Sequence, residues 1–381
     1  GQTGGALDAD IDATEAWTRY TGSGEIVVGV IDTGVNYDHE DLAANIWINP
    51  GEIAGDGIDN DGNGYVDDVR GWDFVNDDND PMDDNKHGTH VAGTIGAVGN
   101  NGVGVAGVNW NVQIMPLKFL DNRGSGTTED AIEAVVYATK MRKLYEMSGG
   151  TKGANIVLTN NSWGGGAASN ALSNAIADSG DENMLFVASA GNSGGGAGYP
   201  ALYPHDNIIS VAATDHADQL ASFSSRGTGV DLAAPGVDIL STMRNKYNTL
   251  SGTSMAAPHV AGVASLVWDR LESNSYGPGY AEVRDLLFST ADTLPSLAGQ
   301  TDTGGRLNAN QALIAADVLL GQESVFSIDD MSVAEGDTDN TIEVVVKREG
   351  NLAKATAVDW ETFAIDATPS FDFVSRSDTV S

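Results

Sequence analysis

The stretch EIVVGVI at residues 25–31 decides the fold class, because it is an almost uninterrupted apolar run that ends at Asp32 and breaks at Gly34. Helical stretches follow at residues 131–144 and 259–271. The further apolar runs are VQIMPLK (112–118), NIVLTNN (155–161), MLFVASA (184–190) and IISVAAT (208–214). Continuous apolar runs, rather than strict alternation, are typical of strands buried on both faces. The pattern predicts an α/β fold with a mostly parallel central sheet flanked by helices.

This pattern stops near Leu320, at the end of the helical stretch 305–320. Alternating segments with turn residues between them follow, which is typical of short β-strands. They are FSIDDMSVAEG (326–336), TIEVVVKREG (341–350), TAVDWETF (356–363) and FDFV (371–374). Three or four strands cover their own core and edges poorly. We therefore predict an α/β domain at residues 1–320, which the motifs below identify as the catalytic domain, and a partial all-β module at residues 321–381.

The composition narrows the function classes. The chain has 381 residues, no cysteine and a formal net charge of −35. The lack of cysteine excludes disulfides, thiolate metal sites and a cysteine nucleophile. The negative field repels nucleic acid and anionic membranes, and no apolar run approaches the roughly 20 residues of a membrane span. The opening GQTGGALDAD shows no signal-peptide pattern, so we interpret the chain as a mature or truncated form.

Three segments each place a reactive side chain at the end of a regular element. They are VVGVIDTGV with Asp32, DNKHGTHVAGTIGAV with His87, and SGTSMAAPHVAGVASLVW with Ser254. Acyl transfer from a peptide needs an alcohol, an imidazole that takes its proton, and a carboxylate that holds the imidazole in one tautomer. A serine that begins a helix also has backbone N–H groups close to the developing oxyanion. Asn192, at a strand end in VASAGNSGG, is the candidate second oxyanion donor.

Each of these residues also has an ordinary structural interpretation. Asp32 suits an Asx turn, His87 a loop position and Ser254 a helix N-cap. Any one of them alone favours that interpretation. Their joint occurrence, in the order Asp, His, Ser, favours a catalytic triad.

The same segments resemble the subtilisin-like serine peptidases, or subtilases. The matching blocks are IDTGV (31–35), HGTHVAGT (87–94), AGN (190–192) and GTSMAAPHVAG (252–262). The chain order Asp, His, Ser is that of subtilisin. The resemblance runs from about Ala6 to Val318, and it implies the subtilisin-like three-layer fold and serine endopeptidase activity.

The resemblance also implies a role for each site residue. Asp32 orients the imidazole, His87 acts as general base and then as general acid, and Ser254 attacks the carbonyl carbon. Asn192 and the backbone N–H of Ser254 bind the oxyanion. The family uses the first histidine of the block, so the competing candidate base His90 is structural, and His259 is interpreted in the same way.

In this family the substrate pairs as an extended strand between two enzyme segments. The matching positions are Gly124, Ser125 and Gly126 on one edge and Ser162, Trp163 and Gly164 on the other. Without the triad, both segments would be interpreted as ordinary glycine-rich turns. Gly198 corresponds to the base of the pocket for the P1 side chain, the substrate residue before the scissile bond. It offers no carboxylate, so we predict broad specificity with a large apolar P1 preference.

Three clusters of oxygen donors predict calcium binding. The first resembles the subtilase high-affinity site and comprises Asp41, Val98, Asn101, Val103 and Val105. The second resembles the medium-affinity site of thermitase-like members and comprises Asp73, Asn76, Asp78, Asp80 and Met82. The third repeats the opening of an EF-hand loop and comprises Asp59, Asp61, Asn63, Tyr65 and Asp67. A solvated acidic face is the alternative for all three, but glycines and asparagines at turn positions favour calcium.

Taken together, these features predict a secreted serine endopeptidase that holds two or three structural Ca2+ ions. Its expected partners are protein and peptide substrates and its own propeptide during maturation, and we expect a monomer. The alternatives are a sequence-specific processing protease and an inactive calcium-binding scaffold. The segment SIDDMSVAEGD (327–337) and the next strand resemble the opening of Calx-beta domains, so the module at 321–381 is predicted to be Calx-beta-like.

Overall fold

The computed structural model describes residues 5–328, 346–350, 358–361 and 377–380. The chain forms two compact units, Gly1–Leu313 and Ile314–Ser381. The domain boundary predicted at residue 320 lies at the end of helix α7 (Ala309–Leu319), and it stays a prediction.

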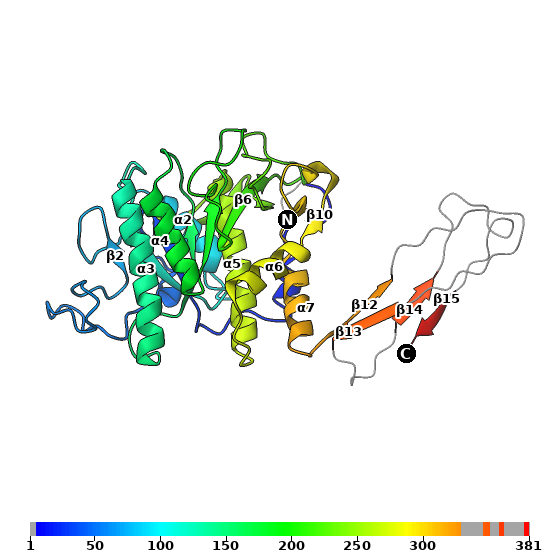
Figure 1. Ribbon diagram of the computed structural model, residues 1–381, viewed down its shortest axis with the longest axis horizontal. Coiled ribbons are helices and arrows are strands. Elements are labelled where there is room, and N and C mark those ends of the chain that lie inside the picture. The colour runs from blue at the N-terminus through cyan, green and yellow to red at the C-terminus, as the bar shows by residue number, and fades with distance from the viewer. Residues whose placement is uncertain (1–4, 329–345, 351–357, 362–376, 381) are drawn as a thin grey trace, which may run out of the picture. The chain divides into compact units, whose positions relative to one another are not determined.

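Within the described residues, the first unit is built on a nine-stranded sheet (Figure 1). In spatial order its strands are β10 (Asp292–Thr293), β11 (Gly305–Arg306), β7 (Leu232–Pro235), β6 (Ile208–Thr214), β5 (Leu185–Ser189), β4 (Ile156–Asn161), β1 (Val27–Asp32), β3 (Gln113–Lys118) and β2 (Trp72–Asp73). Neighbouring strands pair in parallel, except that β10 and β11 are antiparallel. The predicted α/β fold with a mostly parallel sheet is confirmed.

Helices cover both faces of this sheet, which is why its strands are continuous apolar runs. Helices α3 (Thr128–Ser148) and α4 (Asn170–Asp181) pack on each other and share one hydrophobic cluster with Val27 and Ile31 of β1. Helices α2 (His87–Gly96) and α5 (Thr253–Glu272) also pack on each other and on the sheet, and they contribute nothing to that cluster. They therefore cover the opposite face, and all six residues of β1 are buried.

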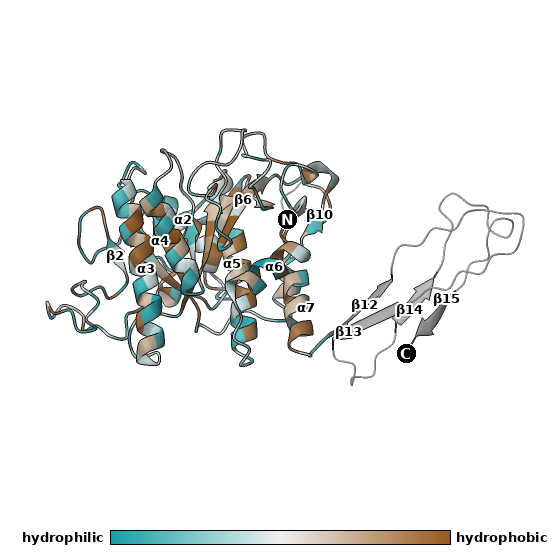
Figure 2. Ribbon diagram, in the orientation of Figure 1, coloured by the Kyte–Doolittle hydropathy of each residue, from teal (hydrophilic) through white to brown (hydrophobic). Residues whose placement is uncertain are grey.

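Figure 2 shows hydrophobic residues in the central strands and a mixture of hydrophobic and hydrophilic residues along α3 and α4. The remaining helices of the described chain are α1 (Ala13–Ala16), α6 (Tyr280–Ser289) and the short 3-10 helices η1 (Ala43–Asn45) and η2 (Pro295–Leu297). A separate antiparallel hairpin, β8 (Ile239–Met243) and β9 (Lys246–Leu250), lies against α2. No helix in the described part of the chain is both long and apolar enough to span a membrane.

In the second unit the structure describes two antiparallel strand pairs. One joins β12 (Ser324–Ile328) to β13 (Val346–Gly350), and the other joins β14 (Val358–Glu361) to β15 (Ser377–Val380). Most of the segment that resembles Calx-beta domains, residues 329–345, lies outside the described residues. The Calx-beta interpretation stays a prediction.

Candidate active site

The end of β1 and the start of α2 approach each other closely, and two glycines permit this. Gly34 has φ +94°, and a Cβ there would lie 2.4 Å from the carbonyl oxygen of Pro81. A Cβ on Gly88 would lie 2.0 Å from the carbonyl oxygen of Gly34. Any side chain at either position would force the two segments apart. The close approach brings Asp32, the last residue of β1, beside His87, the first residue of α2.

His87 and Asp32 form a hydrogen-bonded pair. Nδ1 of His87 lies 2.8 Å from Oδ1 and 3.0 Å from Oδ2 of Asp32. The Asp32 side chain is fully buried, whereas the His87 side chain is 27% exposed, so a substrate can reach the imidazole but not the carboxylate. Burial lowers the pKa of His87, but the Asp32 carboxylate outweighs burial, so the pKa is raised above its ordinary value of 6.5. The carboxylate also fixes the proton on Nδ1, which leaves Nε2 as an acceptor.

Three side chains that the sequence analysis missed hold the segment before His87. Oδ1 of buried Asp83 accepts from the backbone N–H groups of Asn85 and Lys86, both at 2.9 Å. Nζ of Lys118, also buried, donates to Oδ1 of Asp84 at 3.0 Å. Arg244, at the tip of the β8–β9 hairpin, donates to the carbonyl oxygens of Asp84 at 2.8 Å and of Asn85 at 3.3 Å. An acidic residue just before a helix is the signal that could have revealed Asp83.

Ser254 is the second residue of α5. The first backbone N–H groups of a helix have no acceptor within the helix, so they can bind another group. Its Oγ donates to the carbonyl oxygen of Ser162 at 3.0 Å. In return, Oγ of Ser162 donates to the carbonyl oxygen of Ser254 at 2.9 Å. The described residues show no hydrogen bond between Ser254 and His87. The Ser254 hydroxyl is therefore held at the edge predicted to bind substrate.

Asn192 is fixed by its side-chain oxygen. Oδ1 accepts from the backbone N–H of Thr253 at 2.9 Å and from Oγ1 of Thr253 at 3.1 Å. This leaves the amide Nδ2 directed elsewhere. A methyl group on Gly252 would lie 3.5 Å from Nδ2 and 3.7 Å from Oδ1 of Asn192, and 3.7 Å from the backbone N of Ser254, so the two donors lie near each other beside Gly252. Two donors around one space are what a developing oxyanion requires.

The other two histidines of the motifs are engaged elsewhere. Nε2 of His90 lies 3.0 Å from the carbonyl oxygen of Ile239 and 3.2 Å from that of Asn248, so it joins α2 to the β8–β9 hairpin. Nδ1 of His259 lies 2.8 Å from the carbonyl oxygen of Met255 in its own helix. Burial lowers the pKa of both imidazoles to about 4. Neither contacts Asp32 or Ser254, in agreement with the choice of His87 as the candidate base.

A cleft of about 580 Å³ begins at His87 and runs between the two predicted substrate edges. Its walls include all six of the edge residues, namely Gly124, Ser125, Gly126, Ser162, Trp163 and Gly164. Apolar side chains line its interior, among them Phe119, Leu120 and Leu172. Gly198 does not line this cleft, but its N–H donates to the carbonyl oxygen of Ala190, close to Asn192. Tyr199, the next residue, does line the cleft.

The first predicted calcium cluster is assembled around Asp41, whose side chain is buried. Its Oδ1 accepts from the Asn101 amide at 2.7 Å and its Oδ2 from the backbone N–H of Val105 at 2.9 Å. The backbone N–H of Val98 donates to the carbonyl oxygen of Asp41 at 2.9 Å. Val103 joins the loop through its N–H, which donates to Oδ1 of Asn101 at 2.9 Å. The structure thus brings Asp41 together with the loop at 98–105 that carries the other four predicted residues.

The second predicted cluster is only partly gathered. Asp73 accepts from the Asn76 amide at 2.8 Å and exchanges backbone hydrogen bonds with Asp78. Asp80 instead accepts from the hydroxyl of Tyr37 at 2.6 Å, and the N–H of Met82 donates to Asp80 at 3.3 Å. Asp73, Asn76 and Asp78 therefore form one turn, while Asp80 is engaged at Tyr37.

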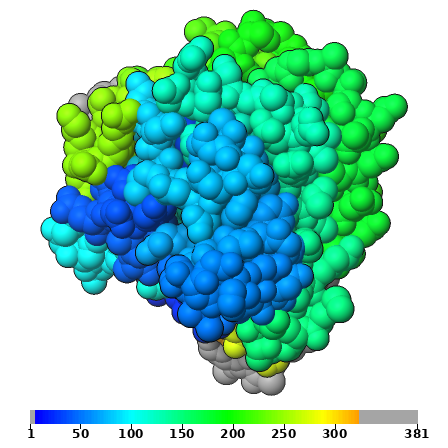
Figure 3. Space-filling model, turned by 90° about the vertical axis from the view of Figure 1, so that its left-hand side faces the viewer, coloured from blue at the N-terminus to red at the C-terminus, as the bar shows by residue number. Residues whose placement is uncertain are grey.

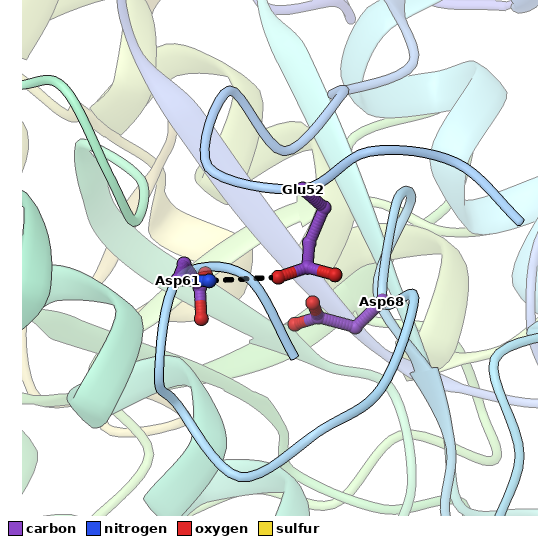
Figure 4. Close-up of side chains that lie close together, drawn as sticks. All are labelled: Glu52, Asp61 and Asp68. Atoms are coloured by element: carbon purple, nitrogen blue, oxygen red, sulfur yellow. Dashed lines mark hydrogen bonds between the residues drawn. The ribbon is translucent and has the colours of Figure 1, made fainter. Parts of the chain in front are cut away.

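The third cluster differs from the set that its spacing predicts. A carboxylate oxygen from each of Glu52, Asp61 and Asp68 lies within 4.8 Å of the others, and Figure 4 shows the three carboxylates facing one another. Among the described residues this is the one such group of three. The dashed line in Figure 4 marks the backbone N–H of Asp61 donating to Glu52 at 2.9 Å. Burial raises the pKa of Asp68 to about 7, and its two acidic neighbours add to this shift.

The remaining predicted ligands of this loop have other partners. The Asp59 carboxylate accepts from the backbone N–H groups of Gly62, Asn63 and Gly64. The Asp67 carboxylate accepts from those of Gly55, Asp56 and Gly57. The Asn63 amide donates to both Asp61 and Asp68, and the Tyr65 ring packs on Trp72 and Tyr137. Figure 3 shows the acidic segment Asp56–Asp84, in blue, as a continuous part of the surface. Of the five predicted ligands, Asp61 and Asn63 lie at the cluster.

The site provides a hydroxyl beside amide donors and an imidazole that shares its proton with a buried carboxylate, and these groups are suited to acyl transfer. These groups lie at the carboxyl ends of parallel strands, where α/β sheets form their sites. The fold and the site together define the class of serine peptidases. The Subtilase family model (Peptidase_S8) matches residues 23–313, and the chain belongs to this family of serine endopeptidases.

Individual relatives agree with this family. Thermitase of Thermoactinomyces vulgaris is 38% identical, over 80% of this chain and 93% of thermitase. The thermophilic serine proteinase of Bacillus sp. (strain AK1) is 39% identical, over 78% of this chain and 64% of that protein. The extracellular protease of Xanthomonas campestris pv. campestris is 36% identical, over 82% of this chain and 55% of that protein. The chain thus spans less than two thirds of the length of two of these relatives.

A solved structure agrees as well. The crystal structure of a cold adapted subtilisin-like serine proteinase matches with a TM-score of 0.58 and 35% identity, over 76% of this chain and 89% of that chain. The predicted subtilisin-like fold is confirmed.

Proposed function

We propose that this chain is a secreted, calcium-stabilised serine endopeptidase in which Asp32, His87 and Ser254 form the catalytic triad. The observation that carries the proposal is the hydrogen bond of 2.8 Å between His87 and the buried carboxylate of Asp32. The position of Ser254 at the start of α5, beside Asn192, supports it. The family supplies the reaction class, hydrolysis of peptide bonds.

The reaction follows from these atoms. Oγ of Ser254 attacks the scissile carbonyl carbon while Nε2 of His87 takes its proton, and Asp32 stabilises the imidazolium that forms. The oxyanion accepts hydrogen bonds from Nδ2 of Asn192 and the backbone N–H of Ser254. His87 then gives the proton to the leaving amine, and the acyl-enzyme remains on Ser254. A water molecule, activated by His87, hydrolyses this ester and restores the free serine. The Ser254 hydroxyl must turn from the Ser162 carbonyl toward His87 in the first step.

Substrate binding is proposed along the cleft beside His87. A peptide strand there hydrogen-bonds to the backbone of Gly124–Gly126 and Ser162–Gly164, which gives affinity independent of side chains. Neither Gly198 nor Ser193 offers a carboxylate to the P1 side chain. These features support broad specificity with a large apolar P1 residue.

Calcium is proposed to stabilise the loops around the site, with two or three ions bound. Three carboxylates as close as Glu52, Asp61 and Asp68 repel one another when ionised, and a divalent cation relieves this repulsion. Glu52 and Asp68 therefore join Asp61 as ligands of the third site. The loop around Asp41 supplies the first site, and the turn at Asp73 supplies the second.

Secretion, a monomeric state and maturation from a propeptide complete the proposal. The relative from Xanthomonas is named as an extracellular protease, which supports secretion. The catalytic unit holds its fold without disulfides, since the chain has no cysteine.

A casein assay on the wild-type chain and on Ser254→Ala tests the proposed activity. Hydrolysis that is blocked by a serine-reactive inhibitor and lost in Ser254→Ala is the expected result. Full activity in Ser254→Ala would overturn the assignment. A peptide-library profile tests the specificity, and a P1 preference for Arg or Lys would contradict the apolar P1 pocket.

A further inference from the structure

The substrate cleft differs in charge from the rest of the molecule. The chain carries a net charge of −35, yet the residues that line the cleft include no aspartate or glutamate. Their one permanently charged side chain is Arg123, which precedes the substrate edge Gly124–Gly126. His87 is the other group in the lining that can carry a positive charge. The lining of the cleft thus carries positive charge and no carboxylate, in a strongly acidic protein.

Arg123 is placed by its backbone, which leaves its side chain available. The Asp121 carboxylate accepts from the N–H groups of Arg123 at 2.9 Å and Ser125 at 3.0 Å, which fixes the turn. The Asn85 amide donates to the carbonyl oxygen of Asn122 at 3.0 Å, which ties this turn to the segment before His87. Within the described residues, the exposed guanidinium of Arg123 makes no hydrogen bond or ion pair. The backbone hydrogen bonds from Ser125 and Arg123, and then the charge of this guanidinium, lower the pKa of the neighbouring Asp121 carboxyl. A fixed backbone that carries a cation without a hydrogen-bonding partner at the cleft suits recognition of a ligand.

We propose that Arg123 is a specificity-determining residue that selects peptides with an acidic side chain in the segment lying between the two substrate edges. This inference rests on the proposed peptidase function and adds a second recognition element to its P1 pocket. A guanidinium presents its donors in a planar fork that matches a carboxylate, so two parallel hydrogen bonds can form. At position 123, a lysine, a glutamine or another neutral side chain would lack the planar fork that forms two parallel hydrogen bonds with a carboxylate.

The acidic surface does not cancel this preference. At physiological ionic strength the screening length is about 8 Å, so distant carboxylates contribute little at the cleft. A direct contact with Arg123 is screened less. Solvent-exposed ion pairs correspond to about two- to fivefold in an equilibrium or rate constant. We therefore expect a preference of this size, and we expect it to weaken as salt is added.

The test uses a series of peptides that share one large apolar P1 residue and carry either Glu or Gln at each neighbouring position in turn. The ratio of kcat/KM for Glu over Gln is measured at each position. The wild-type chain should show a ratio of about two to five at one position. Arg123→Gln should bring that ratio to about one, and Arg123→Glu should bring it below one.

Lys143→Gln is the matched control, because it removes one positive charge on α3, where Lys143 pairs with Glu182 outside the cleft. It should leave the Glu-to-Gln ratio as in the wild type. Equal ratios in wild type and Arg123→Gln at every position would overturn the role of Arg123 while leaving the peptidase proposal intact. If the wild-type chain cleaves none of the peptides and no casein, the proposed function itself fails.

Discussion

Ser162 and Ser254 exchange hydrogen bonds, since the hydroxyl of each donates to the backbone carbonyl of the other, at 2.9 and 3.0 Å. The candidate nucleophile at the start of α5 is therefore joined to the strand end that is proposed to form one substrate edge. Under the proposed function, a peptide that adds to this edge would lie next to the Ser254 hydroxyl. The pair would then couple substrate binding to the position of the nucleophile.

Replacing either serine should separate these two contributions. Ser254→Ala should lower kcat by about 10⁶-fold, because the attacking oxygen is lost. Ser162→Ala removes a hydroxyl but keeps the carbonyl that accepts from Ser254, so activity should fall far less. The kcat of each variant is measured on one peptide, and active-site titration gives the concentration of active enzyme that this requires. Comparable losses in the two variants would mean that Ser254 is not the nucleophile.

The proposed oxyanion site predicts that removing its Asn192 donor lowers kcat. Asn192→Ala should lower kcat by about 10²- to 10³-fold with little change in KM, since its amide acts on charge that develops only in the transition state. Thr253→Val removes one of the two bonds that orient the amide, so it should cost less. Thr253→Ser keeps the hydroxyl and serves as the control. A raised KM with unchanged kcat in Asn192→Ala would assign the residue to ground-state binding instead.

The pH dependence follows from the Asp32–His87 pair. Only neutral His87 accepts a proton, and its pKa is raised, so kcat/KM should fall as pH drops through a value above 6.5. Asp32→Asn leaves burial, which lowers the pKa, so the acid limb should move to lower pH while kcat falls by about 10⁴-fold. The contribution of this pair to folding stability depends on pH in the opposite direction to kcat/KM. The pair stabilises the fold most below the unfolded pKa of about 6.5, and this contribution is lost as pH rises through the folded pKa. An acid limb that does not move in Asp32→Asn would contradict the pairing.

The sequence predicted the triad because each of its residues lies in a local motif at the end of an element. Asp83 has a weaker local signal, and Lys118 and Arg244 have none that singles them out. Arg244 reaches the carbonyl of Asp84 across 160 positions of chain, and a contact of that range depends on how the β8–β9 hairpin packs on α2.

The third predicted calcium cluster shows that, even within one loop, the sequence does not reveal which side chains meet. The spacing of Asp59, Asp61 and Asp67 predicted ligands, but of these three only Asp61 lies in the cluster, together with Glu52 and Asp68. Hydrogen bonds from backbone N–H groups do not separate the two sets, because Asp59, Asp67 and Glu52 all accept them. Which carboxylates face one another depends on the path of the loop. The general position of the cluster followed from composition, whereas its members depended on the backbone.

Calcium removal should lower the free energy of unfolding by an amount that depends on how fully the proposed calcium sites were occupied. At a free concentration 100 times Kd, one ion contributes about 2.7 kcal/mol, so chelator should lower Tm by roughly 5 °C or more. Asp61→Asn keeps Oδ1, which accepts from the backbone N–H of Asn63. It replaces Oδ2, which accepts from the amides of Asn49 and Asn63, and it removes one of the three facing charges. The variant should have a lower Tm in calcium and a smaller drop in Tm on adding chelator, because fewer charges are left to repel one another. Scanning calorimetry in both conditions measures the two drops.

Asp215→Asn is the matched control, because the Asp215 carboxylate also accepts from backbone N–H groups, those of Ala217 and Gln219, but belongs to no carboxylate cluster within the described chain. Its Tm should respond to calcium as in the wild type. A wild-type Tm that is the same in calcium and in chelator would remove calcium from the proposal.

Arg244 should act on catalysis through the position of His87. The residue before the histidine, Lys86, has φ +143°, a conformation that favours glycine, so the segment needs external support. Arg244 supplies it by donating to the carbonyl oxygens of Asp84 and Asn85. Arg244→Met keeps the length of the side chain but removes its donors, and the relaxed segment should displace the imidazole. We expect kcat to fall roughly tenfold with a smaller change in KM, because misplacing a reacting group costs rate more than affinity.

Lys246→Met removes a cation from the same hairpin without touching the histidine segment, and it should leave kcat unchanged. Arg244→Lys restores one donor and should recover part of the rate, which a purely electrostatic effect would recover in full. Steady-state kinetics over a range of pH separate the two explanations, because a lost charge moves the acid limb whereas a displaced imidazole lowers its plateau. Equal kcat in Arg244→Met and Lys246→Met would show that the strained segment holds its conformation without the hairpin.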